Sequence, residues 1–411
     1  MQDSPGAGEA AGGAPDSKAD SARESKPALR LWLLQGKSPG DNAQVLALGE
    51  SLATADSGWQ AEIKTVSPAL RQAGKQFWGQ RPALEVLAAS DMTPPWPDVV
   101  IACGRTPCIV AQWLKEVSGG RLVHVQLGRL ATKPKAIDLI LETAQYGVAP
   151  TANMISLTLP IVRADPLREA ASLAAWEKQL QDLPRPWLGV LVGGPASPIP
   201  FDAADGSRLL RRMTELRRVL GGSLLIAYGP RTPNPVREIL ELGLSGDASD
   251  GRAHRVFGWP PPQPNPYPAI LALADRFLVT CDSASMIADA CVTGKPVEIF
   301  NLAMPEYLTR LSSRGLGFSM DARRRRRHRA GLAPDFLDRL RDFLVTERLL
   351  FPYRDMRDLL HVLNKAAIVG SLDTGADEPP VAGRGKALQE REIAGVKQRI
   401  IGLIRARQNG T

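Results

Sequence analysis

The chain has 411 residues, 44% of them hydrophobic, and a formal net charge of +8 at pH 7. This length exceeds what one hydrophobic core usually serves, so we expect two domains with additional tails. The basic balance favours anionic partners such as nucleotides, nucleic acid or acidic lipid surfaces. No stretch approaches the ~20 apolar residues that span a bilayer, so the sequence predicts no transmembrane helix.

Residues 1–28 are small, polar or charged, which predicts a disordered N-terminal segment, and they lack the apolar core of a signal peptide. The four cysteines fit a reducing compartment, and neither a Cys-x-x-Cys pair nor a His-rich cluster indicates a metal. We therefore expect a cytoplasmic protein, peripheral at the inner face of the membrane, with no metal and no tightly bound cofactor.

From residue 29 the sequence alternates short apolar runs with segments of helical length. The first series predicts strands at 31–34, 59–65, 98–102, 122–127 and 138–141 and helices at 42–53 and 108–117. Such alternation is typical of a mostly parallel sheet that helices cover on both faces. We therefore predict an N-terminal Rossmann-like domain over residues 29–165.

The alternation starts again after residues 166–186, which we expect to form a linker with one helix. The second series predicts strands at 187–192, 223–228, 277–280 and 297–300 and helices at 206–220, 235–242 and 284–293. This repetition predicts a second Rossmann-like domain over residues 187–320. The predicted fold class is α/β, with two doubly wound domains that face a central cleft.

The remaining part is basic. We expect a basic helical region over 321–369, a flexible linker over 370–387 and a basic amphipathic helix over 388–411. A run of arginines, Arg323–Arg329 with His328 inside it, is commonly a solvated face. The sharper alternative is an anchor to an anionic membrane, worth roughly 1 kcal/mol for each cation near the surface. Nucleic acid is less favoured, because no aromatic residues are interleaved with the arginines.

The stretch from Thr280 to Val297 is the most informative. It predicts the end of a buried strand, a helix that begins at Ala284 and stops at Gly294, and a further strand. A helix that opens at the carboxyl end of a parallel strand directs free N–H groups into the crevice, where a diphosphate is the usual anion. Asp289 follows Ser285 by one helical turn, so its carboxylate is a candidate ligand for ribose hydroxyls.

Other loops of the second domain should meet this helix at the same sheet edge. Arg231 is a candidate diphosphate clamp, although it could also be an ordinary surface cation, with the serines only capping helices. Asn265 either borders the base or sugar or forms a rigid turn. The candidate nucleotide-binding residues are Gly193, Gly194, Arg231, Thr232, Asn265, Asp282, Ser283, Ala284, Ser285, Met286 and Asp289.

The first domain offers glycine-containing loops at Gly36, Gly40 and Gly104, the last followed by Arg105, which we predict to lie on the acceptor side. They match neither a Walker A motif nor a dinucleotide-binding fingerprint. Asp41 is the best-placed candidate for a general base. Its alternative role is to cap the helix that follows.

Several pieces of the sequence, in this order, resemble the mitochondrial fission ELM1-like family. They are the Gly36–Asp41 loop, Pro97–Arg105, Leu191–Pro195, Arg231–Pro233, Asn265–Tyr267, Asp282–Met286 and Thr293–Val297. Bacterial members of that family are usually called glycosyltransferases. The resemblance implies a GT-B-like fold with a nucleoside-diphosphate-sugar as co-substrate, bound in the second domain, and no required metal.

This chain departs from the family pattern at two places. It has Asp289 where the family usually has Glu, and Glu142–Tyr146 where the family has a His-Asp pair. With the resemblance, the sequence predicts a glycosyltransferase that acts on a lipid-linked or cell-envelope glycan acceptor. The alternative is a non-catalytic, membrane-associated adaptor that retains the fold.

Overall fold

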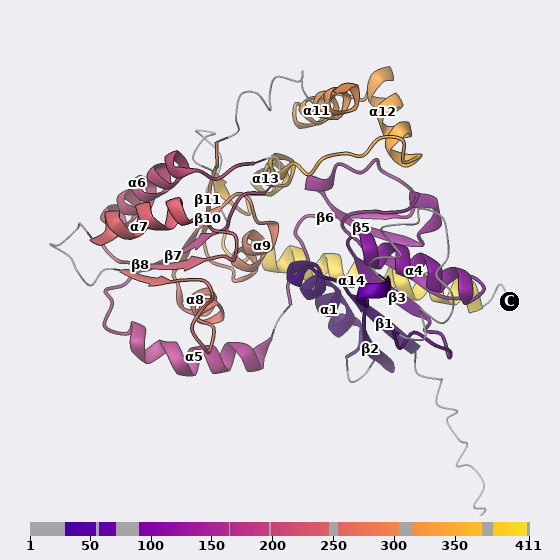
Figure 1. Ribbon diagram of the computed structural model, residues 1–411, viewed down its shortest axis with the longest axis horizontal. Helices are drawn as coiled ribbons and strands as arrows, with labels where there is room; N and C mark the ends of the chain where they lie inside the picture. Colours follow the sequence, from indigo (N-terminus) through magenta and orange to yellow (C-terminus); the bar gives the residue numbers. More distant parts are fainter. Residues whose placement is uncertain are drawn as a thin grey trace, which may run out of the picture.

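The computed structural model describes residues 29–54, 57–70, 90–163, 165–196, 199–245, 254–303, 315–371 and 381–408. Two lobes lie side by side, each built around a parallel sheet (Figure 1). This confirms the predicted α/β class. The segment predicted to be disordered, residues 1–28, lies outside the described residues.

The first sheet has the strand order β2-β1-β3-β4-β5-β6, all parallel. Its strands are β1 (Leu29–Gln35), β2 (Trp59–Thr65), β3 (Val99–Cys103), β4 (Val123–Leu127), β5 (Leu139–Thr143) and β6 (Met154–Leu157). The sequence did not predict β6, because only its last residue is buried and no apolar run marks it. Helices α1 (Pro39–Leu52) and α4 (Arg105–Val117) follow β1 and β3, and short 3-10 turns η1 (Pro134–Ala136) and η2 (Ala144–Tyr146) follow β4 and β5.

The second sheet has the order β12-β11-β10-β7-β8-β9, also parallel. Its strands are β7 (Trp187–Val192), β8 (Ser223–Tyr228), β9 (His254–Phe257), β10 (Arg276–Thr280), β11 (Val297–Phe300) and β12 (Gly370–Ser371). Counted within the domain this is the 3-2-1-4-5-6 order of dinucleotide-binding folds. Because β12 pairs with β11, residues 370 and 371 belong to the sheet and not to a flexible linker.

The helices of the second lobe are α5 (Pro166–Leu180), α6 (Ala203–Leu220), α7 (Asn234–Ser245), α8 (Tyr267–Leu273), α9 (Ala284–Val292) and α13 (Met356–Lys365). Their buried faces and the sheet share one apolar core, which includes Phe277 and Ile287. Helix α9 begins at the predicted residue because Ser283 caps it, and Gly294 follows its end with a left-handed φ of 79°.

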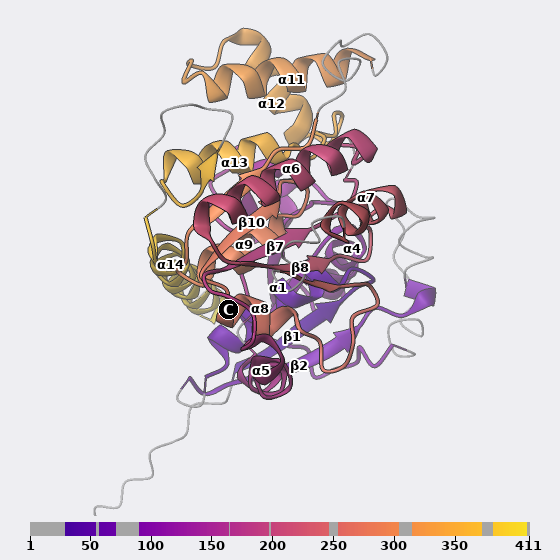
Figure 2. The same ribbon diagram turned by 90° about the vertical axis from the view of Figure 1, so that its left-hand side faces the viewer.

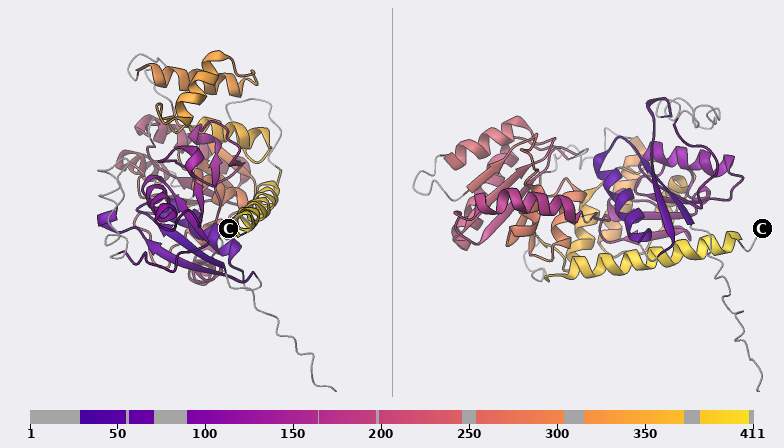
Figure 3. Two further views of the ribbon diagram at one scale, coloured as in Figure 1. Left: turned by 90° about the vertical axis from the view of Figure 1, so that its right-hand side faces the viewer. Right: turned by 90° about the horizontal axis from the view of Figure 1, so that it is seen from below.

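Helix α14 (Arg384–Gln408) returns to the first lobe, and it runs along the lower edge of the right-hand view in Figure 3. Its apolar stripe is buried in the core of the first sheet, through Val396, Ile400 and Ile404. At its other end Gly385 packs against the backbone of Cys291 in α9. The predicted amphipathic helix therefore exists, but its apolar face is part of a core and is not free for a membrane.

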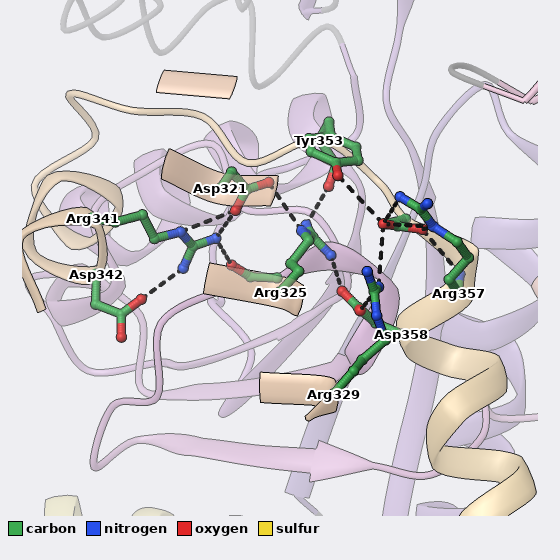
Figure 4. A network of polar contacts seen from close by, with 10 residues as sticks. Asp321, Arg325, Arg329, Arg341, Asp342, Tyr353, Arg357 and Asp358 are labelled. Atoms are coloured by element: carbon green, nitrogen blue, oxygen red, sulfur yellow. Dashed lines mark hydrogen bonds and ion pairs between the residues drawn. The ribbon is translucent and has the colours of Figure 1, made fainter. Parts of the chain in front are cut away.

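Helices α11 (Gly315–Arg329) and α12 (Phe336–Thr346) form a hairpin on the far side of α13 from the sheets (Figure 2). Several arginines of α11 bind carboxylates, both of α11 itself and of neighbouring elements. Arg325 and Arg341 both bind Asp321, and Arg325 and Arg329 bind Asp358 (Figure 4). Arg323 and Arg327 pair with Asp335 and Asp338. This pairing leaves these cations less available to lipid, whereas Arg326 is exposed, so membrane contact through Arg323–Arg329 stays a prediction.

Candidate functional site

Each sheet has one point at which the strand order reverses, and both points coincide with predicted loops. In the second sheet the point lies between β7 and β10, which pair directly. In the first sheet it lies between β1 and β3. Ligands of open α/β sheets bind in the crevice beyond the carboxyl ends of such strands. The loops after β1, β3, β7 and β10 therefore define the candidate site.

The connections after β7 and β10 are held together by a buried carboxylate, Asp282. It accepts hydrogen bonds from the backbone N–H of Gly194 at 2.9 Å and from the hydroxyl of Thr280 at 2.6 Å. Burial raises the pKa of Asp282, and the hydrogen bonds with Thr280 and Gly194 and the charge of Arg231 oppose that rise. A Cβ atom on Gly193 would lie 2.1 Å from Oδ2 of this carboxylate, so the position requires glycine.

The N-terminus of α9 is capped by Ser283, whose hydroxyl accepts from the N–H of Met286 at 3.4 Å. Ala284 is buried, and Met286 packs against the core of the second lobe. Ser285 points across the cleft, since a Cβ atom on Gly40 would lie 3.3 Å from its hydroxyl oxygen. The first turns of α1 and α9, which come from different lobes, therefore face each other.

In the loop after β8 the Arg231 side chain is exposed and the Thr232 side chain is buried. The Arg231 side chain is 54% exposed, its Nη2 lies 3.9 Å from Asp282, and its Nη1 donates to the carbonyl of Pro195. Thr232 is buried and its hydroxyl donates to the carbonyl of Gly193 at 2.7 Å. Arg231 can therefore reach a ligand in the crevice, whereas Thr232 fixes the loop.

Asp289 and Asn265 are joined through Tyr267, at the start of α8. The Tyr267 hydroxyl donates to Oδ2 of Asp289 at 2.9 Å, and Asn265 Oδ1 accepts from the backbone N–H of Tyr267 at 3.0 Å. Burial raises the pKa of Asp289 to about 6, and the hydrogen bond from Tyr267 limits the rise. Asn265 thus forms the structural turn that was one of its two predicted roles.

On the opposite side Asp41 lies in the first turn of α1, and Ser38 rather than Asp41 caps that helix. Its carboxylate is close to Gly104, on which a Cβ atom would lie 2.9 Å from Oδ2. Burial raises the pKa of Asp41, against hydrogen bonds with Cys103 and Ser38 and the charges of Arg354 and Arg129. Gly36 is tied to the same helix start, because its N–H donates to Asn42 Oδ1 at 2.8 Å.

Two further arginines of the cleft were missed by the sequence reasoning. Arg354 precedes α13, where the N–H of Asp355 donates to the carbonyl of Gln145 in η2. Burial, with the charges of Arg231 and Arg129, lowers the pKa of Arg354, while Tyr146 and Asp282 oppose this. Arg129 follows β4 after a single glycine. Its position just beyond the end of a predicted parallel strand could have identified it as a candidate from the sequence alone.

The arrangement combines a helix N-terminus, arginines from both lobes and a half-buried carboxylate with a raised pKa. The N–H groups and guanidiniums can bind a diphosphate, and the carboxylate can accept a proton. Within the described ranges, no group of three or more His, Cys, Asp or Glu side chains is arranged to hold a metal ion. No described helix has the length and apolarity needed to cross a membrane.

Fold and site together define a two-lobed α/β protein whose cleft is lined by a helix N-terminus and by arginines. The family model described as mitochondrial fission ELM1 matches residues 39–318, and the chain belongs to this family. The Arabidopsis thaliana protein named mitochondrial fission protein ELM1 is 30% identical over 230 residues, which cover 49% of this chain and 51% of that protein. The match therefore spans about half the length of this curated relative.

Solved structures with low sequence identity are also similar. A glycosyltransferase from Rickettsia africae is 10% identical with a TM-score of 0.45, over 92% of this chain and 99% of that one. Anabaena HepE, in complex with UDP and glucose, is 12% identical with a TM-score of 0.43, over 92% of this chain and 100% of that one. Both TM-scores lie below 0.5, so the fold is defined here by its own sheet topology.

Proposed function

We propose that this protein is a metal-independent glycosyltransferase that uses a nucleoside-diphosphate-sugar as donor. The observation that carries the proposal is the meeting of the two switch-point crevices, with Gly40 beside Asp41 facing Ser285 at the start of α9. An anion-binding helix start and a candidate base are thereby brought to opposite walls of one cleft. We further propose a lipid-linked or cell-envelope glycan as the acceptor.

In this proposal the donor diphosphate binds the N-terminus of α9, with Ser283, Ser285 and Arg231 as ligands and the Gly193–Gly194 backbone as a floor. Arg354 adds positive charge from the other side of the cleft. Asp289 with Tyr267 borders the ribose, and Asn265 and Met286 lie beyond it. Transition-state stabilisation comes mainly from these fixed positive groups, because negative charge grows on the diphosphate as it leaves.

The reaction forms one bond and breaks another at the anomeric carbon of the sugar. An acceptor hydroxyl oxygen attacks this carbon, the bond from the carbon to the diphosphate oxygen breaks, and the hydroxyl proton passes to Asp41. The raised pKa of Asp41 makes it a stronger base than an exposed aspartate. The rate should therefore rise with pH through that pKa, since only the ionised carboxylate accepts the proton.

Calorimetric titration with UDP-, GDP-, ADP- and CMP-linked sugars tests the donor role. We expect one nucleotide class to bind, and Arg231→Gln to weaken it at least about tenfold, as loss of a charge-assisted contact does. Arg211→Gln, an exposed arginine of α6, is the matched control and should bind as the wild type does. Absence of binding by every nucleotide sugar would refute the donor role.

A non-catalytic adaptor is the alternative, favoured by the name of the Arabidopsis relative. An adaptor would bind a partner through the same fold and release no nucleoside diphosphate from a donor. For the location we propose the cytoplasm, with peripheral contact at the inner face of a membrane. The surface that supports this contact is the exposed apolar face of α12, which carries Phe336, Leu340 and Phe343.

A further inference from the structure

A cavity with an unusual lining opens on the first-lobe side of the cleft. Its volume is about 350 Å³, and it lies between the first lobe and the segment that joins α12 to α13. Four arginines line it: Arg105 at the start of α4, Arg129 after β4, Arg348 after α12 and Arg354 before α13.

The charges of these arginines are not balanced by the protein. Among the described residues, no carboxylate lies within 4.0 Å of any of the four guanidinium groups. The Nε atoms of Arg348 and Arg354 are buried without a hydrogen-bond partner in the described part of the chain. Burial lowers the pKa of both side chains, and no described carboxylate in direct contact offsets that cost. Arg348 Nη2 donates only to the carbonyl of Leu130, at 3.0 Å, within the described part of the chain, and Asp282 opposes the lowering of the Arg354 pKa without forming an ion pair with it.

The arginines of α11 provide a contrast within the same molecule. Arg325 and Arg341 are also buried, but each binds carboxylates, as Figure 4 shows. A buried cation without an opposite charge is costly, and the fold supplies carboxylates to α11 while leaving the cavity without them. An anionic ligand would supply the missing partners.

The rest of the lining is apolar. It includes Leu130, Val148, Val345 and Phe351, and the guanidinium of Arg348 lies 4.5 Å from the centre of the Phe351 ring. Phe351 is 52% exposed, and its neighbour Leu349 is 70% exposed. The apolar wall of the cavity therefore continues onto an exposed apolar surface.

The cavity is also coupled to the proposed reaction centre. Arg129 and Arg354 both act electrostatically on Asp41, and Arg354 also interacts with Asp282 in the donor crevice. A group bound by these arginines would lie on the acceptor side of the cleft, within electrostatic range of the base.

We propose that this cavity binds the phosphate group of an acceptor whose phosphate is attached to an apolar chain. Arginine forks match phosphate oxygens in geometry and charge, and the apolar wall leads the chain from the cavity to the surface. The identification of this ligand as the acceptor rests on the proposed function. The binding of an anionic amphiphile follows from the cavity alone.

The test is titration of the full chain with dodecyl phosphate below its critical micelle concentration, beside inorganic pyrophosphate and dodecyl maltoside. We expect dodecyl phosphate to bind at least tenfold more tightly than either other probe. Arg348→Gln and Arg105→Gln should each weaken this binding about tenfold or more. Arg326→Gln, an exposed arginine of α11 outside the cavity, should leave it unchanged.

Equal affinity for dodecyl maltoside would overturn the anion site, and equal affinity for pyrophosphate would overturn the role of the apolar chain. Unchanged dodecyl phosphate binding by both Arg348→Gln and Arg105→Gln, each with a wild-type melting temperature, would also overturn the proposal. Titration of both variants with the nucleotide-sugar panel separates the two hypotheses. If dodecyl phosphate binds and no nucleotide sugar does, the proposed function fails and the phosphate site stands.

Discussion

Gly193 lies where the backbone after β7 passes closest to Asp282. In Gly193→Ala the new Cβ would lie 2.1 Å from Oδ2 and 2.6 Å from Cγ of a carboxylate that the fold holds in place. We expect a loss of about 1–3 kcal/mol in the free energy of unfolding, as for other overpacked sites, together with weaker donor binding. Denaturant unfolding and nucleotide titration measure these effects.

Gly258→Ala is the matched control, because a Cβ atom on Gly258 has nothing within 4 Å. If the two variants were equally stable and bound donors equally, Asp282 would not hold the crevice in the way described.

Asp289 gives the site a predictable pH dependence of stability. Burial raises its pKa from 3.8 to about 6 in the folded protein. The protonated form is therefore favoured by folding, and its stabilising contribution is complete below pH ~4 and lost as the pH rises through ~6. Relative to the wild type, Asp289→Asn should gain up to about 3 kcal/mol between pH 4 and pH 7, measured by urea unfolding.

Tyr267→Phe provides the companion measurement. The Tyr267 hydroxyl lowers the pKa of Asp289, so its removal should move the loss of stability to a higher pH. A stability difference between Asp289→Asn and the wild type that does not change with pH would contradict a buried, titrating Asp289.

Residue types and strand ends were enough to predict which loops come together at the switch points of the two sheets. The capping serine of α9 and the glycines after β1, β3 and β7 are local features that a single sequence displays. The direction of a loop side chain is not a local property, so the sequence could not distinguish the buried Thr232 from the exposed Arg231. Arg354 gave no signal, because its neighbours Arg129, Arg231 and Asp41 come together only in the folded molecule.

At the scale of elements, α14 tests whether the C-terminal segment is core or accessory. Ile400 is fully buried in the core of the first sheet. Ile400→Ala should therefore cost about 2–5 kcal/mol in the free energy of unfolding, measured by denaturant titration. Gln398→Ala, at an exposed position of the same helix, should change stability by less than about 0.5 kcal/mol. Equal effects would mean that α14 does not complete the first lobe.

On helix α12 charged residues are buried and large apolar residues are exposed, which is the reverse of the usual pattern for a surface helix. Asp338 and Arg341 are buried, while Phe336 is 76% and Phe343 57% exposed. An exposed apolar face of this kind is typical of a surface that meets a membrane or another protein. We expect Phe336→Ser with Phe343→Ser to reduce flotation with phosphatidylglycerol vesicles at least tenfold.

Leu242→Ser is the matched control for this experiment, because Leu242 is 74% exposed on α7 and lies outside the α11–α12 hairpin. It should float as the wild type does. If the α12 variant floated equally well, or if the wild type did not float at all, α12 would not be the membrane-contacting surface.

The periodicity of the sequence predicted where most helices lie in the chain. It could not predict which other elements pack against them. The stripe of α14 has the pattern of a membrane-surface helix, yet Val396, Ile400 and Ile404 face a sheet that begins more than 350 residues earlier. The run of arginines in α11 similarly indicated a solvated charged face. Several of the carboxylates that pair with these arginines lie on α12 and α13, so the local pattern could not reveal them. The sequence did not predict strand β12, because a strand of two residues is too short to show an alternation of apolar and polar residues.

At the scale of the whole molecule, the chain crosses between the lobes more than once. It passes from the second sheet through α11, α12 and Arg354 to the cleft, adds β12 to the second sheet, and then returns as α14 to the first lobe (Figure 1). The Glu392 carboxylate of α14 accepts hydrogen bonds from the N–H of Thr158 at 3.0 Å and from its hydroxyl at 2.7 Å. The C-terminal segments therefore help to hold both walls of the cleft.

The most direct test of the central claim is the release of nucleoside diphosphate from the donor that binds, followed for the wild type, Asp41→Asn and Arg231→Gln. We expect turnover by the wild type and a kcat lowered about 10²-fold or more by Asp41→Asn at nearly unchanged donor affinity, as for loss of a general base. Arg231→Gln should lower kcat/KM mainly through weaker donor binding. Donor binding without any release of nucleoside diphosphate, or equal rates for all three proteins, would contradict the account.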